Sequence, residues 1–81
     1  MNIDVLAQHI TTDPAIQHGR PCIKGTRTSV QAILASLAGG DDITTITRAF
    51  APATVDDVRA CILYAALLAG EEEFIPQTQH A

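Results

Sequence analysis

The fold is decided by residues 28–70, TSVQAILASLAGGDDITTITRAFAPATVDDVRACILYAALLAG, which contain three apolar patterns with helical spacing. The first pattern repeats at positions i, i+3, i+4, i+7 and i+8 and consists of Val30, Ile33, Leu34, Leu37 and Ala38. This spacing predicts a helix with one continuous apolar face. We expect Thr28 to cap this helix, with Gln31 in the capping-box position, and Gly39-Gly40 to end it.

A second, shorter helix follows at once. Its apolar face consists of Ile43, Ile46, Thr47 and Phe50. Asp42 precedes this pattern and can cap the helix, since its carboxylate accepts amide hydrogen bonds and suits the positive end of the helix dipole. Ala51-Pro52 should stop the helix, because proline restricts the residue before it to extended conformations.

The third helix is predicted to begin after Thr54, with Asp57 in the capping-box position, and Gly70 should either weaken or end it. We expect its inward face to consist of Val55, Val58, Ile62, Ala65, Ala66 and Ala69. Leu63, Leu67 and Leu68 then make this helix apolar on more than one face. Three short helices cannot cover every side of such a helix, so we expect a second copy of the chain to cover the rest.

Residues 1–27 form an N-terminal arm in this interpretation. His9–Thr12 and Arg20–Lys24 are expected to be short strands that pair as a hairpin, and Asp13-Pro14 should start a turn. Residues 1–8 have no decisive pattern. The chain is therefore predicted to be mainly α, with a strand-containing arm (1–27), a three-helix unit (28–70) and an acidic, disordered tail (71–81).

The charges are unevenly distributed along a chain whose formal net charge is −4. Arg20, Lys24 and Arg27 lie within residues 15–40, a stretch that contains no acidic residue. The net charge argues against sequence-independent nucleic-acid binding. The local basic segment can nevertheless contact phosphates, or else pair with acids of the body or of a partner protein. With three phosphate contacts, DNA affinity falls only about forty-fold between 50 and 200 mM salt, which is typical of weak electrostatic binding. With the six contacts of a dimer it falls about a thousand-fold, so the electrostatic contribution is much larger. Useful DNA binding would therefore require a dimer.

The last two helices have the proportions of a helix-turn-helix, with the turn at residues 50–53. In that motif, exposed residues early in the last helix reach base edges. Here Arg59 is the one residue of a type that commonly reads bases, whereas Asp56 and Asp57 repel phosphate. We therefore interpret the aspartates as helix caps and the third helix as a poor reader of DNA.

No arrangement typical of catalysis is recognisable. Ser29 and Ser36 lack a neighbouring His–Asp pattern, and His9 and His18 offer too few ligands for a metal ion. Cys22 lies near a lysine that could lower its thiol pKa, but no base accompanies it, so a structural role is favoured. We expect a protein that is no enzyme and that binds neither cofactor nor metal.

The two cysteines, Cys22 and Cys61, have neither the spacing of a disulfide framework nor that of a metal site, so we expect reduced thiols. The N-terminus lacks the basic cluster of a secretory signal. No apolar run reaches the roughly 18–20 residues that a membrane-spanning helix needs. These features predict a cytoplasmic protein with no membrane association.

The segment GRPCIKGTR (residues 19–27), followed by the first helical pattern, resembles a family of small bacterial proteins catalogued as domain of unknown function 433, which are similar to antitoxins of the VapB type. The matching motif positions are Gly19, Pro21, Ile23, Gly25, Thr26 and Arg27. The resemblance runs from about Ile10 to Ala69. It implies a homeodomain-like three-helix fold behind a short strand region, usually dimeric. It also implies a role as the antitoxin partner of a small toxin, with DNA binding for autoregulation.

We therefore expect an antitoxin-like regulator that acts as a homodimer, binds a partner toxin and, as a second ligand, operator DNA. The residues expected to contact DNA or a partner are Arg20, Lys24, Arg27 and Arg59. The alternative is a protein–protein interaction module with no nucleic-acid role. A small enzyme that uses Cys22 is a third, less supported interpretation.

Overall fold

The structure is a computed structural model that describes residues 3–71. The predicted tail therefore lies outside the described residues, apart from Glu71. The elements, in chain order, are α1 (Ile3–Leu6), β1 (Ile10–Thr11), the 3-10 turn η1 (Gln17–Gly19), β2 (Cys22–Ile23), α2 (Val30–Ala38), α3 (Ile43–Ala49) and α4 (Val55–Glu71). The chain is mainly helical, with a small two-stranded antiparallel sheet near its N-terminus, as predicted.

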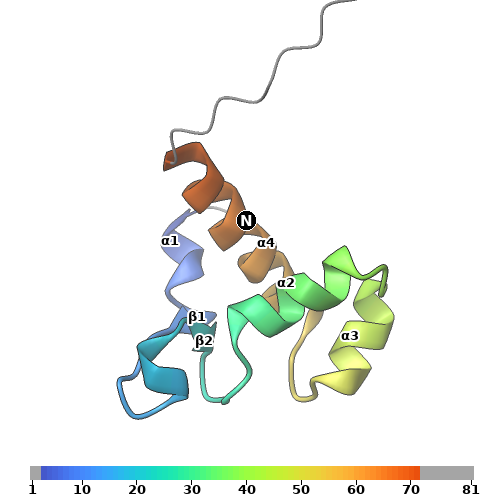
Figure 1. Ribbon diagram of the computed structural model, residues 1–81, viewed down its shortest axis with the longest axis horizontal. Helices are drawn as coiled ribbons and strands as arrows, with labels where there is room; N and C mark the ends of the chain where they lie inside the picture. Colours follow the sequence, from blue (N-terminus) through green and yellow to red (C-terminus); the bar gives the residue numbers. More distant parts are fainter. Residues whose placement is uncertain (1–2, 72–81) are drawn as a thin grey trace, which may run out of the picture.

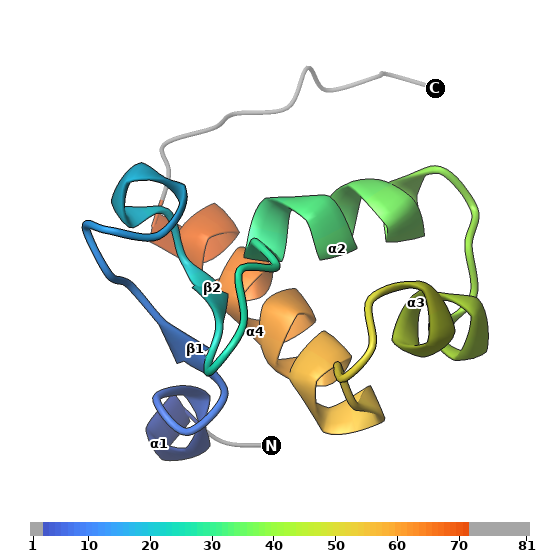
Figure 2. The ribbon, with the colours of Figure 1, turned by 90° about the horizontal axis from the view of Figure 1, so that it is seen from below.

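The longest helix, α4, lies at the centre of the molecule (Figures 1 and 2). It packs against α1 and β1 on one side and against α3 on the other, while α2 crosses it. The connection from α3 to α4, residues 50–54, includes a cis peptide bond between Ala51 and Pro52. Because so many elements contact α4, its sequence determines most of the packing.

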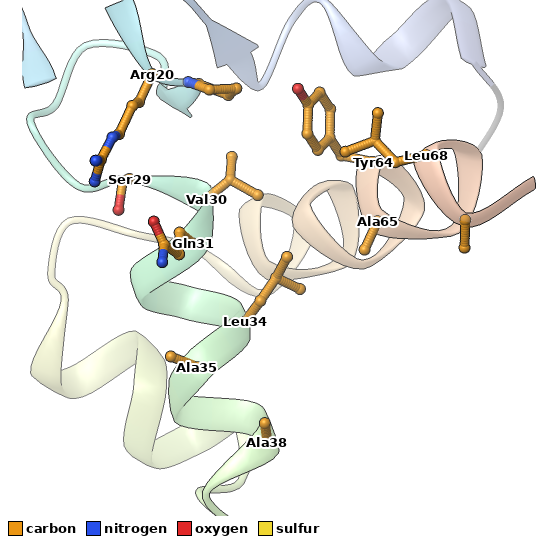
Figure 3. A pocket seen from close by; sticks show the side chains of 12 residues that line it. Arg20, Ser29, Val30, Gln31, Leu34, Ala35, Ala38, Tyr64, Ala65 and Leu68 are labelled. Atoms are coloured by element: carbon orange, nitrogen blue, oxygen red, sulfur yellow. The ribbon is translucent and has the colours of Figure 1, made fainter. Parts of the chain in front are cut away.

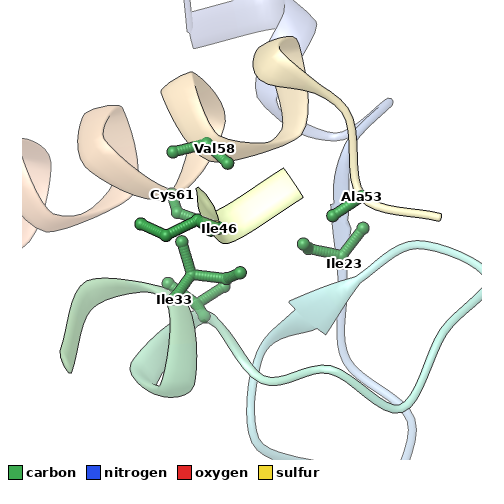
Figure 4. Packing of buried hydrophobic residues seen from close by; sticks show 7 residues of the cluster. Ile23, Ile33, Ile46, Ala53, Val58 and Cys61 are labelled. Carbon is green, nitrogen blue, oxygen red and sulfur yellow. The ribbon is translucent and has the colours of Figure 1, made fainter. Parts of the chain in front are cut away.

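The core lies where α2, α3, α4 and β2 converge (Figure 4). Its most deeply buried large side chains are Ile23, Ile33, Ile46, Val58 and Cys61. The predicted apolar faces of α2 and α3 are confirmed except at Ala38, which is exposed. Each helix contributes its central isoleucine to this cluster. Burial of apolar surface at about 25 cal/mol per Å² is the main force that holds the helices together.

The helix caps agree with the sequence at two of three positions. The Asp42 carboxylate accepts a hydrogen bond from the Thr45 amide (2.8 Å). Hydrogen bonding with Thr45 lowers the pKa of Asp42. Thr54 and Asp57 form the predicted reciprocal capping box. The prediction for α2 is wrong, because its cap is Ser29, whose hydroxyl accepts the Ala32 amide (3.1 Å). Thr28 is occupied instead: its carbonyl accepts the amide of the β2 residue Ile23.

The predicted inward face of α4 is only partly right. Val58 is fully buried, as expected, but Val55 and Ile62 are exposed by 44% and 43%. The core instead receives Ala60 and Cys61, with Tyr64 partly buried against it. An almost uniformly apolar helix offers several equivalent stripes, so spacing alone could not select one. The helix also continues through Gly70 to Glu71 rather than ending at the glycine.

A fourth helix covers part of the apolar surface that the sequence left unexplained. Residues 3–6, for which no structure was predicted, form α1, and α1 packs on α4. Leu63 and Leu67 are half-buried, whereas Leu68 remains 44% exposed. The apolar surface of α4 that a second chain would have to cover is therefore smaller than the three-helix prediction required.

The two predicted strands pair as expected. Ile10 lies opposite Ile23, and Thr11 lies opposite Cys22. The predicted turn start at Asp13 is also confirmed, since its carboxylate accepts the Ala15 amide (2.9 Å). Among residues 3–71, no helix has the length and apolar character needed to cross a membrane.

Candidate functional site

The motif segment, residues 19–27, folds as a tight connection between the turn η1 and the start of α2. Gly19 (φ +83°) continues a left-handed stretch that includes Gln17 and His18. Gly25 (φ +81°) occupies the third position of a four-residue turn closed by the Thr26 amide on the Ile23 carbonyl (3.0 Å). That turn position requires positive φ, which glycine adopts without strain.

The remaining motif residues connect this segment to the body. The Thr26 hydroxyl donates to the Ile23 carbonyl (2.8 Å) and accepts the Thr28 amide (3.0 Å). The Pro21 carbonyl accepts the amide of Val30, the first residue of α2 (2.9 Å), which satisfies one of the free donors at a helix start. Because Ile23 is also a core residue, the motif positions other than Arg27 have structural roles.

The predicted contact residues are all exposed, but the structure does not bring them to one place. Arg20 borders a groove between α2 and α4, whereas Lys24 borders a separate hollow beside β1. Arg27 lies in the loop before α2, and Arg59 lies on the first half of α4. Within residues 3–71, none of the four makes an ion pair. Their charges are therefore available to an external partner, at more than one position on the surface.

An open groove between α2 and α4 has a volume of about 790 Å³ (Figure 3). Its α2 wall includes Val30, Leu34 and Ala38, and its α4 wall includes Tyr64 and Leu68. Figure 3 shows Leu34 and Leu68 at the open space and Arg20 beside the N-terminal end of α2.

The complete lining is Arg20, Pro21, Ser29, Val30, Gln31, Leu34, Ala35, Ala38, Tyr64, Ala65, Leu68 and Ala69. This lining is apolar, with a few polar groups and one charged side chain, Arg20. Apolar grooves between helices commonly receive an apolar segment of another protein. Sequence reasoning missed the groove because it depends on how α2 crosses α4. The one signal available was the excess of leucine on the third helix, and only Leu68 of those residues belongs to the groove.

At the start of α4, His9 joins the predicted capping box of Thr54 and Asp57, a contact that the sequence did not suggest. The Nδ1 atom of His9 lies 2.9 Å from Oδ1 of Asp57, and Oδ2 of Asp57 accepts the Thr54 amide (2.9 Å). Partial burial raises the pKa of Asp57, but the hydrogen bonds with His9 and Thr54 outweigh it, so this pKa lies below its ordinary value. Asp57 is thus a structural cap. Together with the exposed Asp56 beside it, it makes the start of the helix acidic and poorly suited to phosphate.

The cysteines are free and buried. The Cys22 thiol donates to the Arg20 carbonyl (3.4 Å), and burial together with the nearby Asp57 charge raises the pKa of Cys61 to about 11. These environments are those of structural thiols rather than nucleophiles. Among the residues described, no group of three or more His, Cys, Asp or Glu side chains is placed to hold a metal ion.

The profile of a family described as "Protein of unknown function (DUF433)" matches residues 10–65 of the chain. The matched range includes both strands, the motif segment, α2, α3 and the first part of α4. Neither the curated proteins nor the solved structures contain a significant match to the chain.

Proposed function

The chain belongs to the DUF433 family, and from this premise we propose that it is an antitoxin-like regulator that acts by binding a partner protein in the groove between α2 and α4. The observation that carries the proposal is the open apolar groove itself, with Leu68 exposed on its α4 wall. Exposed apolar surface of this kind costs free energy in water, and burial against a partner recovers it.

The charges around the groove indicate the chemistry of the partner. Arg20 is its one charged lining residue, and the α2 wall belongs to the stretch, residues 15–40, that contains no acidic residue. An apolar segment flanked by carboxylates would therefore meet attraction at Arg20 and no repulsion along α2. A small toxin with such a segment, in an amphipathic helix or an extended strand, fits this surface.

The experiment uses two matched substitutions on α4. Leu68→Asp places a charge in the groove, and Ile62→Asp places the same charge on an equally exposed residue that does not line the groove. The tagged chain is co-expressed with the protein encoded beside its gene, and affinity is measured by calorimetry. A central apolar contact is worth about 2 kcal/mol, so Leu68→Asp should weaken binding about thirty-fold.

Two results would contradict the proposal. The first is a neighbouring gene product that does not bind the native chain at micromolar concentration. The second is equal binding by the Leu68→Asp variant and the native chain, which would place the contact elsewhere.

A homodimer is part of the proposal. Val55 and Ile62 lie two turns apart on one face of α4 and are among the most exposed large apolar side chains. A second copy of the chain could cover this face while leaving the groove to the partner. Sedimentation of the Ile62→Asp variant tests this directly, since only this variant, and not Leu68→Asp, should shift the chain from dimer to monomer.

Operator DNA is a second candidate ligand. It is favoured by one observation: Arg20, Lys24, Arg27 and Arg59 are exposed and make no ion pair within residues 3–71. A gel shift with the DNA upstream of the gene should show binding that weakens steeply between 50 and 200 mM salt. Replacing Lys24 and Arg27 by glutamine should reduce the slope. Binding that is unaffected by these changes would exclude the basic segment as the DNA contact.

A further inference from the structure

We propose that the groove between α2 and α4 is occupied, in the free protein, by the chain's own residues 72–76, Glu-Glu-Phe-Ile-Pro, with Phe74 against Leu34 and Leu68. This segment would be displaced by a partner protein. The occupancy stands on the groove and the sequence alone, whereas its regulatory consequence rests on the proposed function.

Continuity of the chain supports this occupant. Leu68 and Ala69 line the groove near the end of α4, and the described helix ends at Glu71. Residues 72–76 therefore start within one helical turn of the groove wall. Extended, these five residues span about 16 Å, which exceeds the length of roughly 13 Å expected for the nine-residue α2 that forms the opposite wall. The segment can thus reach the groove without unfolding α4.

Composition supports the same occupant. Phe74 and Ile75 are the large apolar residues that follow α4, and they adjoin the acidic run Glu71–Glu73. The groove presents the complementary character: apolar walls and a single charged side chain, Arg20, which has no ion-pair partner within residues 3–71. An acidic and apolar segment tethered beside such a groove binds at a high effective concentration, so even weak contacts suffice.

Intrinsic tyrosine fluorescence can report on the groove. The chain contains one tyrosine and no tryptophan, and that tyrosine, Tyr64, lines the groove. Quenching of intrinsic fluorescence by acrylamide therefore measures solvent access at this surface. Methyl resonances of Leu34 and Leu68 report the ring current of a neighbouring phenylalanine.

The experiment compares full-length variants in pairs. Phe74→Ser should increase quenching of Tyr64 and shift the two leucine methyl resonances, whereas its tail control, Gln77→Ser, should leave both unchanged. Arg20→Gln should produce a smaller change in the same direction. Its control, Lys24→Gln, removes an equivalent charge from a residue that borders a different hollow and should change nothing.

Adding the peptide EEFIPQTQHA (residues 72–81) to the Phe74→Ser variant should restore the native signals. Identical leucine shifts in the native chain and the Phe74→Ser variant would overturn the proposal, because the tail would then lie outside the groove. Shifts that depend on protein concentration would also overturn it, since the occupant would be a second copy.

The partner assay separates this proposal from the proposed function. If the tail occupies the groove and also restrains binding, Phe74→Ser should bind the partner more tightly than the native chain. If Phe74→Ser changes the groove signals while Leu68→Asp leaves partner binding intact, the occupancy stands and the proposed function fails. If Leu68→Asp loses partner binding while Phe74→Ser leaves the groove signals unchanged, the proposed function stands and the occupancy fails.

Discussion

The contact between His9 and Asp57 joins the start of β1 to the start of α4 across 48 residues of sequence, and its removal should be measurable. The side chains are exposed by 21% and 15%, so solvent weakens the interaction only in part. A hydrogen bond to a charged group is worth about 1.5–3 kcal/mol. We take the lower end, and predict that His9→Ala lowers the free energy of unfolding by about 1.5 kcal/mol.

Asp57→Ala should cost more, because it also removes the capping box with Thr54. Adding about 1 kcal/mol for the cap gives a loss of about 2.5 kcal/mol. The double variant His9→Ala/Asp57→Ala should lose about the same 2.5 kcal/mol rather than the sum, since the two residues share one interaction. Thr54→Ala, which removes one side of the capping box and leaves His9 in place, should cost only about 1 kcal/mol.

Urea denaturation of the four variants and the native chain gives these values, and thermal melting provides a check. For a domain of this size, 1 kcal/mol corresponds to about 4–8 °C, so His9→Ala should melt about 6–12 °C below the native chain. Additive losses in the double variant would refute the reasoning, because they would show that the two side chains stabilise the fold independently.

Four further predictions concern the core, the motif turn, the titration of the cap and a buried thiol. Ile33→Ala, at a fully buried position, should cost about 3 kcal/mol in urea denaturation through the cavity it leaves. Gly25→Ala should cost about 1 kcal/mol in thermal melting, because its positive φ opposes a side chain although nothing lies near an added methyl group. The folded-state pKa of Asp57 lies below its ordinary value of 3.8. Its stabilisation should therefore be fully present well above pH 3.8 and be lost as the pH falls through the folded-state pKa. Asp57→Asn should remove this acid-side component from the pH profile of stability. In the native state at pH 8 the buried Cys61 thiol, with a pKa of about 11, should react with a thiol reagent only as fast as the chain opens.

The helices could be predicted from the sequence because their signals are local. Asp42 and Thr54 cap the helices they precede, and the large apolar residues of α2 and α3 repeat with helical spacing. The register of α4 could not be predicted, since apolar residues surround this helix and the neighbours that select the buried face come from distant parts of the chain. The helix α1 was missed because four residues are too few to establish a period.

The candidate site was less predictable than the fold. The four basic residues expected to contact DNA or a partner are exposed, but they lie at separate positions: Arg20 borders the groove and Lys24 borders a different hollow. The groove and the His9–Asp57 contact both require residues far apart in sequence to meet. Such pairings depend on tertiary packing, for which the spacing of residues along one element carries no information.

The segment that precedes α2 shows which property of the chain family membership determines: its backbone structure. Gly19, Gly25 and Thr26 set the path of the backbone. The Pro21 carbonyl bonds to the first amide of α2, and the Ile23 side chain is buried in the core. The side chains at positions 20 and 24 lie between the signature positions and are exposed to solvent. The family signature therefore specifies the backbone path of this segment. Two chains that share this signature can carry opposite charges at positions 20 and 24, and can thus recognise different molecules with the same backbone path.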